Sequence, residues 1–175
     1  ALALAERWPD AAVVGVDPTA RMIDVGRRKS ERGRICWIQG DGLSLPFPDE
    51  SFDGVVSAFL LRNVVDVPRA LAEQRRVVRY GGRVVCLELS WPQTPVFRTL
   101  FRVYFGDLLP RIAGVLSGEP AAYRYLPRSV QRFLAPGELT RAMEKTGLRN
   151  VRYHKLALGT VTLHVAECVT KGRIF

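Results

Sequence analysis

The chain has 175 residues, of which 47% are apolar and 25% charged, a balance that indicates a compact globular protein and excludes a disordered or repetitive one. No apolar run approaches the roughly 18 residues that a membrane-spanning helix needs. The formal charge of +9 comes from 26 basic and 17 acidic residues dispersed along the chain, so it is compatible with nucleic acid, an anionic lipid surface or simply solvated helix faces.

The first part of the chain alternates β-branched runs with helical patterns. We expect helices at residues 2–7 and 19–30, the second with a basic last turn, and strands at residues 13–17, 35–39 and 52–59. The third strand is apolar along most of its length, as a central parallel strand is. This order favours βαβ units and a mostly parallel sheet covered on both faces.

The second part continues the same rhythm after a polar loop. The sequence predicts a helix over residues 67–80, with Pro68 in its first turn. Gly81 and Gly82 follow it, and we expect them to close the helix in a left-handed cap. The remaining predicted elements are a strand at 83–89, a helix at 136–146, and strands at 151–158 and 161–168. The last two strands form a hairpin, which adds an antiparallel pair to the sheet.

Residues 91–136 interrupt the alternation. Their apolar side chains recur at helical spacing, and Arg98 and Arg102 lie beside this stripe. The segment follows the carboxyl end of a strand, where open parallel sheets bind their ligands. We therefore expect a helical lid over a substrate, and an ordinary helix packed on the sheet is the alternative.

Two acidic residues follow predicted strands at their carboxyl ends. A carboxylate in the position of Asp17 can accept both hydroxyls of a ribose, although an Asp after a strand is also a common helix cap. Asp41 is followed by Gly42, and this pair alone predicts a plain turn. Both residues are candidates for binding a nucleoside.

Three short motifs carry a family resemblance: Leu-Pro-Phe-Pro-Asp at 45–49, Leu-Arg-Asn-Val at 61–64 and Tyr-Arg-Tyr-Leu at 123–126. In this order they resemble the class I S-adenosylmethionine-dependent methyltransferases, and among them the C-methyltransferases that complete menaquinone and ubiquinone. The resemblance implies an α/β, Rossmann-like class I methyltransferase sheet, mostly parallel with a C-terminal antiparallel hairpin. It implies a single domain over residues 1–175, with the lid at 91–136. The family's first strand and Gly-rich loop should precede Ala1, so we expect a domain that is partial at its N-terminus.

The resemblance also assigns roles at the cofactor. S-adenosyl-L-methionine is the expected cofactor, with its ribose on Asp17, Met22 near the adenine, and Asp41 and Gly42 on the adenine edge. Ala58 ends the third strand where the family often has a hydroxyl residue near the cofactor, which is a departure from the pattern. Met22 has core packing as its alternative role.

The expected catalytic residues are Arg62, Asn63 and Tyr123. An Arg can hold a phenolate or a water, an Asn can orient a ring oxygen, and a Tyr can stack on or hydrogen-bond to an aromatic ring. Their alternatives are a surface Arg, a capping Asn and buried packing. Glu88 and Ser90 match a further family pattern, and we expect them to line the pocket.

The implied reaction is C-methylation of a demethylated polyprenyl quinol, in the cytoplasm and at the inner face of the cell membrane. The predicted partners are the quinol and, transiently, an anionic membrane surface; a homodimer is compatible with the sequence. Another lipid or small-molecule acceptor, and a non-catalytic methyltransferase-like module, are the alternatives. No base-flipping motif is present, so nucleic acid is not an expected partner.

The cysteines and histidines do not suggest a metal site. Cys36, Cys86 and Cys168 lie in apolar, strand-like contexts without a Cys-x-x-Cys pair, which favours reduced thiols. His154 and His164 have no neighbouring Asp or Cys at ligand spacing. His164 matches a family histidine, but a single His in a strand more often has a structural role.

Overall fold

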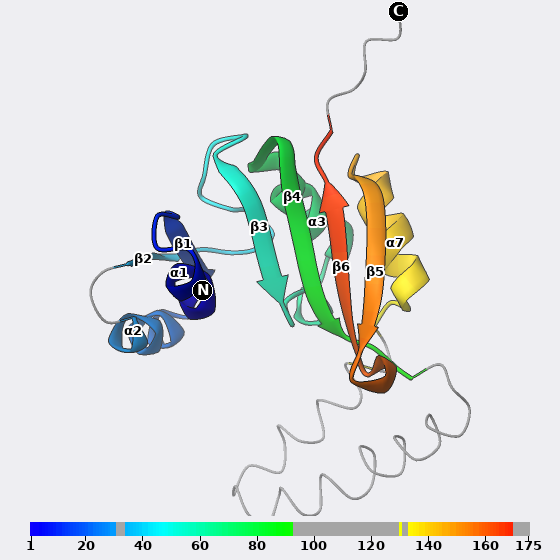
Figure 1. Cartoon of the computed structure of the whole chain (residues 1–175), viewed down its shortest axis with the longest axis horizontal. Helices are drawn as coiled ribbons and strands as arrows, with labels where there is room; N and C mark the ends of the chain where they lie inside the picture. Colours follow the sequence, from blue (N-terminus) through cyan, green and yellow to red (C-terminus); the bar gives the residue numbers. More distant parts are fainter. Residues whose placement is uncertain (31–33, 93–129, 131–132, 170–175) are drawn as a thin grey trace, which may run out of the picture. The chain divides into compact units, whose positions relative to one another are not determined.

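The computed structural model describes residues 1–30, 34–92, 130 and 133–169 (Figure 1). The chain forms two compact units, residues 1–48 and 49–175, and each is considered by itself. Most of the predicted lid, with Tyr123, lies outside the described residues.

The first unit is a small βαβ arrangement. It contains the helices α1 (Leu2–Arg7) and α2 (Ala20–Lys29) and the strands β1 (Val13–Asp17) and β2 (Ile35–Gln39). The two strands pair in parallel, with Val13 opposite Ile35 and Asp17 opposite Gln39. All four elements agree with the predictions from sequence.

Trp37 determines how closely α2 approaches the two strands. A Cβ atom on Gly15 of β1 would lie 2.5 Å from ring carbons of Trp37, and one on Gly26 of α2 would lie 2.7 Å from them. The indole Nε1 donates a hydrogen bond of 2.9 Å to Oγ of Ser30, just after α2. The two glycines therefore make room for the ring that holds helix and strands together.

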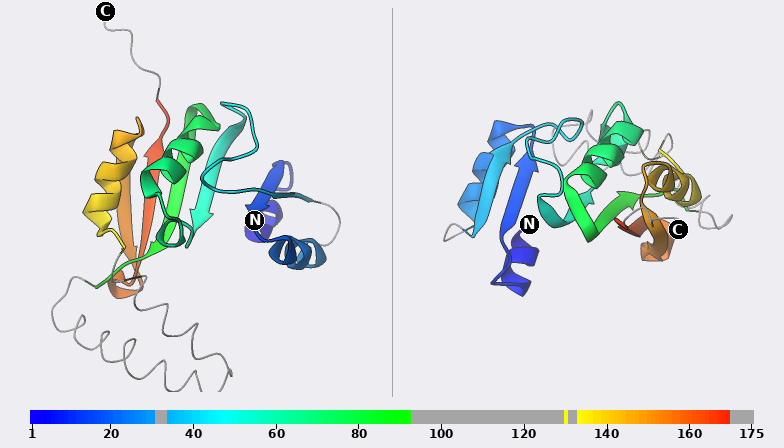
Figure 2. Two further views of the ribbon diagram at one scale, coloured as in Figure 1. Left: turned by 180° about the vertical axis from the view of Figure 1, so that it is seen from behind. Right: turned by 90° about the horizontal axis from the view of Figure 1, so that it is seen from above.

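The second unit contains a mixed sheet with helices on one face. Its elements are β3 (Phe52–Ala58), η1 (Leu61–Asn63), α3 (Val67–Arg76), β4 (Val78–Leu89), α7 (Pro136–Lys145), β5 (Arg149–Leu156), η3 (Ala157–Gly159) and β6 (Val161–Glu167). Within the described residues the strand order is β3-β4-β6-β5, where β3 and β4 are parallel and the β4–β6 and β6–β5 pairs are antiparallel. The predicted terminal hairpin is confirmed. Figure 2 shows α3 and α7 on the same face of this sheet.

The core of this unit lies between the sheet and the two helices. Alternate residues of β4 and β6 are buried there, and the large apolar side chains beneath the helices include Leu71, Leu139 and Met143. His164 on β6 is buried in this layer, and its Nε2 donates a 2.9 Å hydrogen bond to the carbonyl of Pro136, which fixes the start of α7. This contact gives His164 the structural role expected of a single strand histidine.

The opposite face of the sheet differs from the expectation of helices on both faces. Half-exposed apolar side chains point to it from the two central strands, among them Val85, Leu87, Leu163 and Val165. In the part of this unit that the structure describes, both α-helices lie on the other face.

The predicted end of the helix at Gly81 and Gly82 is wrong. α3 ends at Arg76, and both glycines lie inside β4, because Val78 already pairs with Phe52 of β3. The register then shifts, and the extra residues of β4 form a bulge, where Gly81 adopts a φ of +81°. The N–H of Gly81 donates to the carbonyl of Cys168 over 2.7 Å, which ties the bulge to the end of β6.

Candidate functional site

Asp17 and Asp41 come together at one edge of the β1–β2 pair. Asp17 is the last residue of β1 and lies opposite Gln39, the last residue of β2, and Asp41 follows two residues later. Two hydrogen bonds join the strand ends: Gly40 N–H donates to the Asp17 carbonyl over 3.2 Å, and Gln39 Nε2 donates to the Pro18 carbonyl over 2.9 Å. The two acidic strand ends are therefore neighbours in this unit.

Asp17 combines a local structural role with spare acceptor capacity. Its Oδ1 accepts a 2.8 Å hydrogen bond from the N–H of Thr19, the N-cap residue of α2, whose own side chain makes no cap bond. The carboxylate is thereby held at the start of the helix. Among the described residues no donor reaches Oδ2, and this oxygen remains available for a hydroxyl ligand.

Asp41 and Gly42 form the turn that the Asp-Gly pair predicts. Oδ1 of Asp41 accepts from Leu43 N–H over 2.9 Å, and Ser44 N–H donates to the Asp41 carbonyl over 3.0 Å. The turn orients an exposed carboxylate beside the end of β2. The hydrogen bonds of the turn are thus compatible with ligand binding at Asp41, just as the hydrogen bond to Thr19 is compatible with ligand binding at Asp17.

Met22 lies in the first turn of α2, next to this acidic edge, and is 54% exposed, whereas its neighbour Ile23 is buried. Core packing is therefore not its role. Two carboxylates with free lone pairs and an exposed thioether match the chemistry of an adenosine, which offers a ribose diol, an exocyclic amino group and an apolar ring face. The acceptor oxygens and the thioether of this unit fit the adenosine part of S-adenosylmethionine.

The second unit carries Arg62 and Asn63 on a turn at the carboxyl end of β3. The exposed Ala58 ends the strand, and Phe59 reverses the chain with a φ of +57°, its N–H donating to the Leu87 carbonyl over 2.8 Å. Nδ2 of Asn63 donates to the carbonyl of Phe59 over 2.7 Å, so this amide stabilises the turn itself.

Arg62 lies on the outer side of the same turn. Its Nη1 donates to Oδ1 of Asn63 over 3.5 Å, and its guanidinium carbon is 6.0 Å from the centre of the Phe59 ring, a cation–π distance. The guanidinium of Arg62 places a positive charge beside the end of β3.

Glu88 is the buried acid behind this turn. It lies in β4, is 1% exposed, and its Oε1 accepts a 2.6 Å hydrogen bond from Leu61 N–H. Burial raises the pKa of Glu88 to about 7, against the opposing effects of the Leu61 N–H and the positive charge of Arg62. In the sequence, the sign of such a buried acid is a Glu at a position whose neighbours on the same face of the strand, Val84 and Cys86, are apolar. Ser90 instead bonds to Thr162 and Gly159, which joins β4 to the terminal hairpin.

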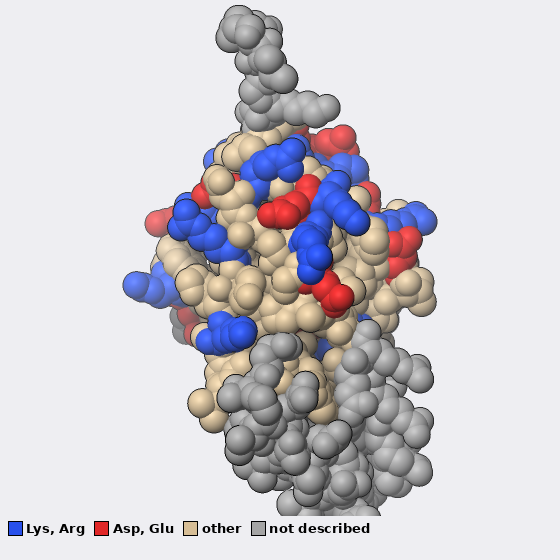
Figure 3. Space-filling view, turned by 90° about the vertical axis from the view of Figure 1, so that its right-hand side faces the viewer, with Lys and Arg blue, Asp and Glu red and all other residues tan. Residues whose placement is uncertain are grey.

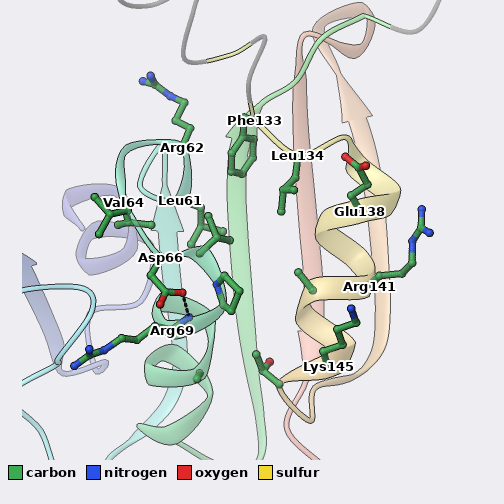
Figure 4. A pocket seen from close by; sticks show the side chains of 16 residues that line it. Leu61, Arg62, Val64, Asp66, Arg69, Phe133, Leu134, Glu138, Arg141 and Lys145 are labelled. Atoms are coloured by element: carbon green, nitrogen blue, oxygen red, sulfur yellow. Dashed lines mark hydrogen bonds between the residues drawn. The ribbon is translucent and has the colours of Figure 1, made fainter.

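A groove of about 1340 Å³ lies beside Arg62, between the η1–α3 turn and α7 (Figure 4). Its lining is mainly apolar, and basic side chains alternate along its sides. The residues that line it are Leu61, Arg62, Val64, Val65, Asp66, Val67, Pro68, Arg69, Ala72, Phe133, Leu134, Glu138, Arg141, Ala142, Lys145 and Thr146. The two acids are engaged locally: Asp66 caps α3 through Arg69 N–H, and Glu138 accepts from Ala135 N–H at the start of α7.

The surface charge on the α7 side is mixed. Figure 3 shows Lys and Arg side chains interspersed with Asp and Glu over the described part of this face. A continuous basic track of the kind that nucleic-acid-binding proteins use is not seen there.

The chain is similar to known proteins over most of its length. Residues 2–168 match the ubiE/COQ5 methyltransferase family. The demethylmenaquinone methyltransferase of Thermus thermophilus is 45% identical over 169 residues, which cover 95% of this chain and 76% of that protein. The ubiquinone/menaquinone biosynthesis C-methyltransferase UbiE of Syntrophotalea carbinolica is 43% identical, over 94% of this chain and 70% of its own length.

Solved structures confirm the fold. A SAM-dependent methyltransferase of Thermotoga maritima superposes with a TM-score of 0.62 at 19% identity, covering 89% of this chain and 72% of its own. The fold is therefore that of the class I methyltransferases, α/β with a mixed sheet, and the chain is an S-adenosylmethionine-dependent methyltransferase. More narrowly, it belongs to the ubiE/COQ5 methyltransferase family.

Proposed function

We propose that this methyltransferase transfers a methyl group to a ring carbon of a demethylated polyprenyl quinol, as its relatives' names describe for demethylmenaquinone. The observation that carries the proposal is identity of 42–45% with demethylmenaquinone methyltransferases over more than nine-tenths of the chain. The acceptor is a demethylmenaquinol or the corresponding intermediate of ubiquinone synthesis.

The cofactor is assigned to the first unit. Asp17 accepts hydrogen bonds from the ribose hydroxyls, Asp41 accepts one from the adenine amino group, and Gly42 and Met22 lie against the base. Bound S-adenosylmethionine supplies an activated methyl group on a positive sulfur. The support for these roles is that the two carboxylates meet at one edge and keep free acceptor capacity. Ala58, exposed at the end of β3 in the second unit, stays a prediction from the family resemblance.

The acceptor is assigned to the second unit. The guanidinium of Arg62 stabilises the phenolate of the quinol, which makes the adjacent ring carbon nucleophilic. Asn63 holds this turn through its bond to Phe59 and orients Arg62 through Oδ1. Tyr123, outside the described residues, is proposed to contact the quinol ring.

The groove beside Arg62 supports a place for the enzyme at the inner face of the cell membrane. Its apolar lining suits the first isoprene units of the quinol tail, and Arg69, Arg141 and Lys145 along its sides suit anionic headgroups. Among the helices that the structure describes, none has the length and apolar character of a membrane span. A homodimer stays a prediction, which sedimentation analysis tests.

The function is tested with the gene product as encoded, including any residues that precede Ala1. Purified protein is incubated with radiolabelled S-adenosylmethionine and either a short-chain demethylmenaquinol, a demethylated benzoquinol of the ubiquinone pathway, a phospholipid or a sterol. Label in a quinol, with none in the phospholipid or the sterol, supports the proposal, and the quinol that carries the label identifies the ring system. Label in phospholipid or sterol, with none in the quinols, contradicts it.

A further inference from the structure

Glu88 occupies a position where the strand pattern calls for an apolar side chain. Val84 and Cys86 precede it on the buried phase of β4, and both are fully buried against the helices. A carboxylate in such a layer costs free energy unless other groups compensate it. Its burial therefore has to be explained by the contacts that it makes.

Those contacts are with the η1 turn. Oε1 accepts the 2.6 Å hydrogen bond from Leu61 N–H, and the N–H groups of Leu60 and Arg62 also favour the charged carboxylate. A carboxylate at the start of a helical turn satisfies N–H groups that have no partner within the turn. Glu88 thus holds the backbone of the turn from the sheet side.

The same turn is fixed from its outer side by Asn63. Nδ2 of Asn63 bonds to the Phe59 carbonyl over 2.7 Å, and Asn63 N–H bonds to the Leu60 carbonyl over 2.9 Å. Leu61, fully buried, anchors the middle of the turn in the core. The backbone of Arg62 is therefore held between a buried carboxylate and a surface amide.

The hydrogen bond to the turn uses only one of the two carboxylate oxygens of Glu88. Oε2 of Glu88 is buried and has no hydrogen-bond partner among the described residues. The charged group that acts on Glu88 is Arg62 of η1, by attraction. Cys86, the preceding residue on the same face of β4, is a neutral thiol whose pKa Glu88 helps to raise, and Thr162, the partner of Glu88 on β6, is uncharged. A Gln would keep an oxygen for Leu61 N–H but would lose the attraction to Arg62, so the charge of Glu88 links the strand to the Arg62 side chain as well as to the turn.

We propose that Glu88 is a positioning residue for methyl transfer: its buried carboxylate holds the η1 turn and attracts Arg62, which sets the guanidinium for the acceptor oxygen. The inference rests on the proposed role of Arg62 at the quinol. It adds to that role a second residue, on a different strand, which does not touch the substrate.

The test compares Glu88→Gln with wild type in the methyl-transfer assay, over a pH range from about 5.5 to 8.5. Gln keeps an oxygen for Leu61 N–H but loses the charge. We expect kcat to fall roughly 10- to 100-fold, with the KM for the quinol and the Kd for S-adenosylhomocysteine within about threefold of wild type. The wild-type kcat should rise as Glu88 ionises near neutral pH, and this step should be absent from the variant.

Two further variants separate positioning from general damage. Asp53→Asn removes an exposed carboxylate of β3 that pairs with Arg79, and it should leave kcat and its pH profile unchanged. Glu88→Asp keeps the charge and should recover part of the activity that Gln loses. A Gln variant with wild-type kcat and an unchanged pH profile overturns the proposal, as does a loss of activity with the pH step retained. If the wild type itself does not methylate the quinol, the proposed function fails first, and this proposal fails with it.

Discussion

Glu88 should make the stability of the protein depend on pH in an unusual direction. Burial raises the pKa of this carboxyl from 4.5 to about 7 in the folded protein. Because the folded state binds its proton more tightly than the unfolded state, the stabilising contribution is complete below about pH 4.5 and is lost as the pH rises through about 7. One pKa unit corresponds to about 1.4 kcal/mol, so the loss is about 3 kcal/mol between pH 4.5 and pH 8.

The change that isolates this effect is Glu88→Gln, which cannot ionise. Urea unfolding of both proteins at pH 5 and pH 8 gives the free energy of unfolding at each pH. His164 acts in the opposite direction, because burial lowers its pKa and its contribution is lost as the pH falls below about 6.5. The difference between wild type and variant removes His164 from the comparison.

We expect the wild type to lose up to about 3 kcal/mol more than the variant on going from pH 5 to pH 8, so that Glu88→Gln is the more stable protein at pH 8. The Asp53→Asn variant serves as the control for removal of an exposed carboxylate. Equal pH dependence in the wild type and in Glu88→Gln would refute the reasoning, because it would mean that Glu88 titrates alike in the folded and unfolded states.

Three further outcomes follow from the packing and the turn. Gly15→Ala places a Cβ 2.5 Å from the Trp37 ring and should lower the free energy of unfolding, measured by urea titration, by about 1–3 kcal/mol. The control is Gly137→Ala, whose Cβ would have no atom within 4 Å, and it should not lower the free energy of unfolding. Burial raises the pKa of Cys86 to about 11, so iodoacetamide should label the exposed Cys36 and spare Cys86 until the protein is unfolded, as peptide mass analysis reports. Arg62→Lys should lower kcat by roughly 10-fold or more, with unchanged S-adenosylhomocysteine affinity by calorimetry.

The sequence was most informative where a local pattern determines the structure. Asp17 could be located because the β-branched run before it stops at a carboxylate, and Asp41 because it follows a second short strand by two residues. Their adjacency follows from the parallel pairing of the two strands. The error at Gly81 and Gly82 has a long-range cause. A glycine pair after a helical run is typical of a helix cap, and only the pairing of Val78 with Phe52, far away in the sequence, shows that the strand has already begun.

The candidate site was predictable in part. The motif with Arg62 and Asn63 marks the turn after β3, but the sequence does not reveal that the Asn63 amide bonds to the carbonyl of Phe59. Met22 reads as a core residue from its apolar character, and its exposure depends on which side of α2 meets the strands. The role of Glu88 depends on a hydrogen bond to a residue 27 positions away, which residue spacing does not predict.

Asp17 and Asp41 are proposed to bind the adenosine of S-adenosylmethionine. Calorimetric titration of S-adenosylhomocysteine into the full gene product, and into its Asp17→Asn, Asp41→Asn and Asp24→Asn variants, tests it most directly; Asp24 is an exposed acid of α2, away from the strand ends. A lost charge-assisted hydrogen bond is worth about 1.5–3 kcal/mol, so the first two variants should each weaken binding by roughly 10-fold or more, and Asp24→Asn should bind like wild type. Wild-type affinity in both the Asp17 and Asp41 variants would show that neither carboxylate binds the adenosine.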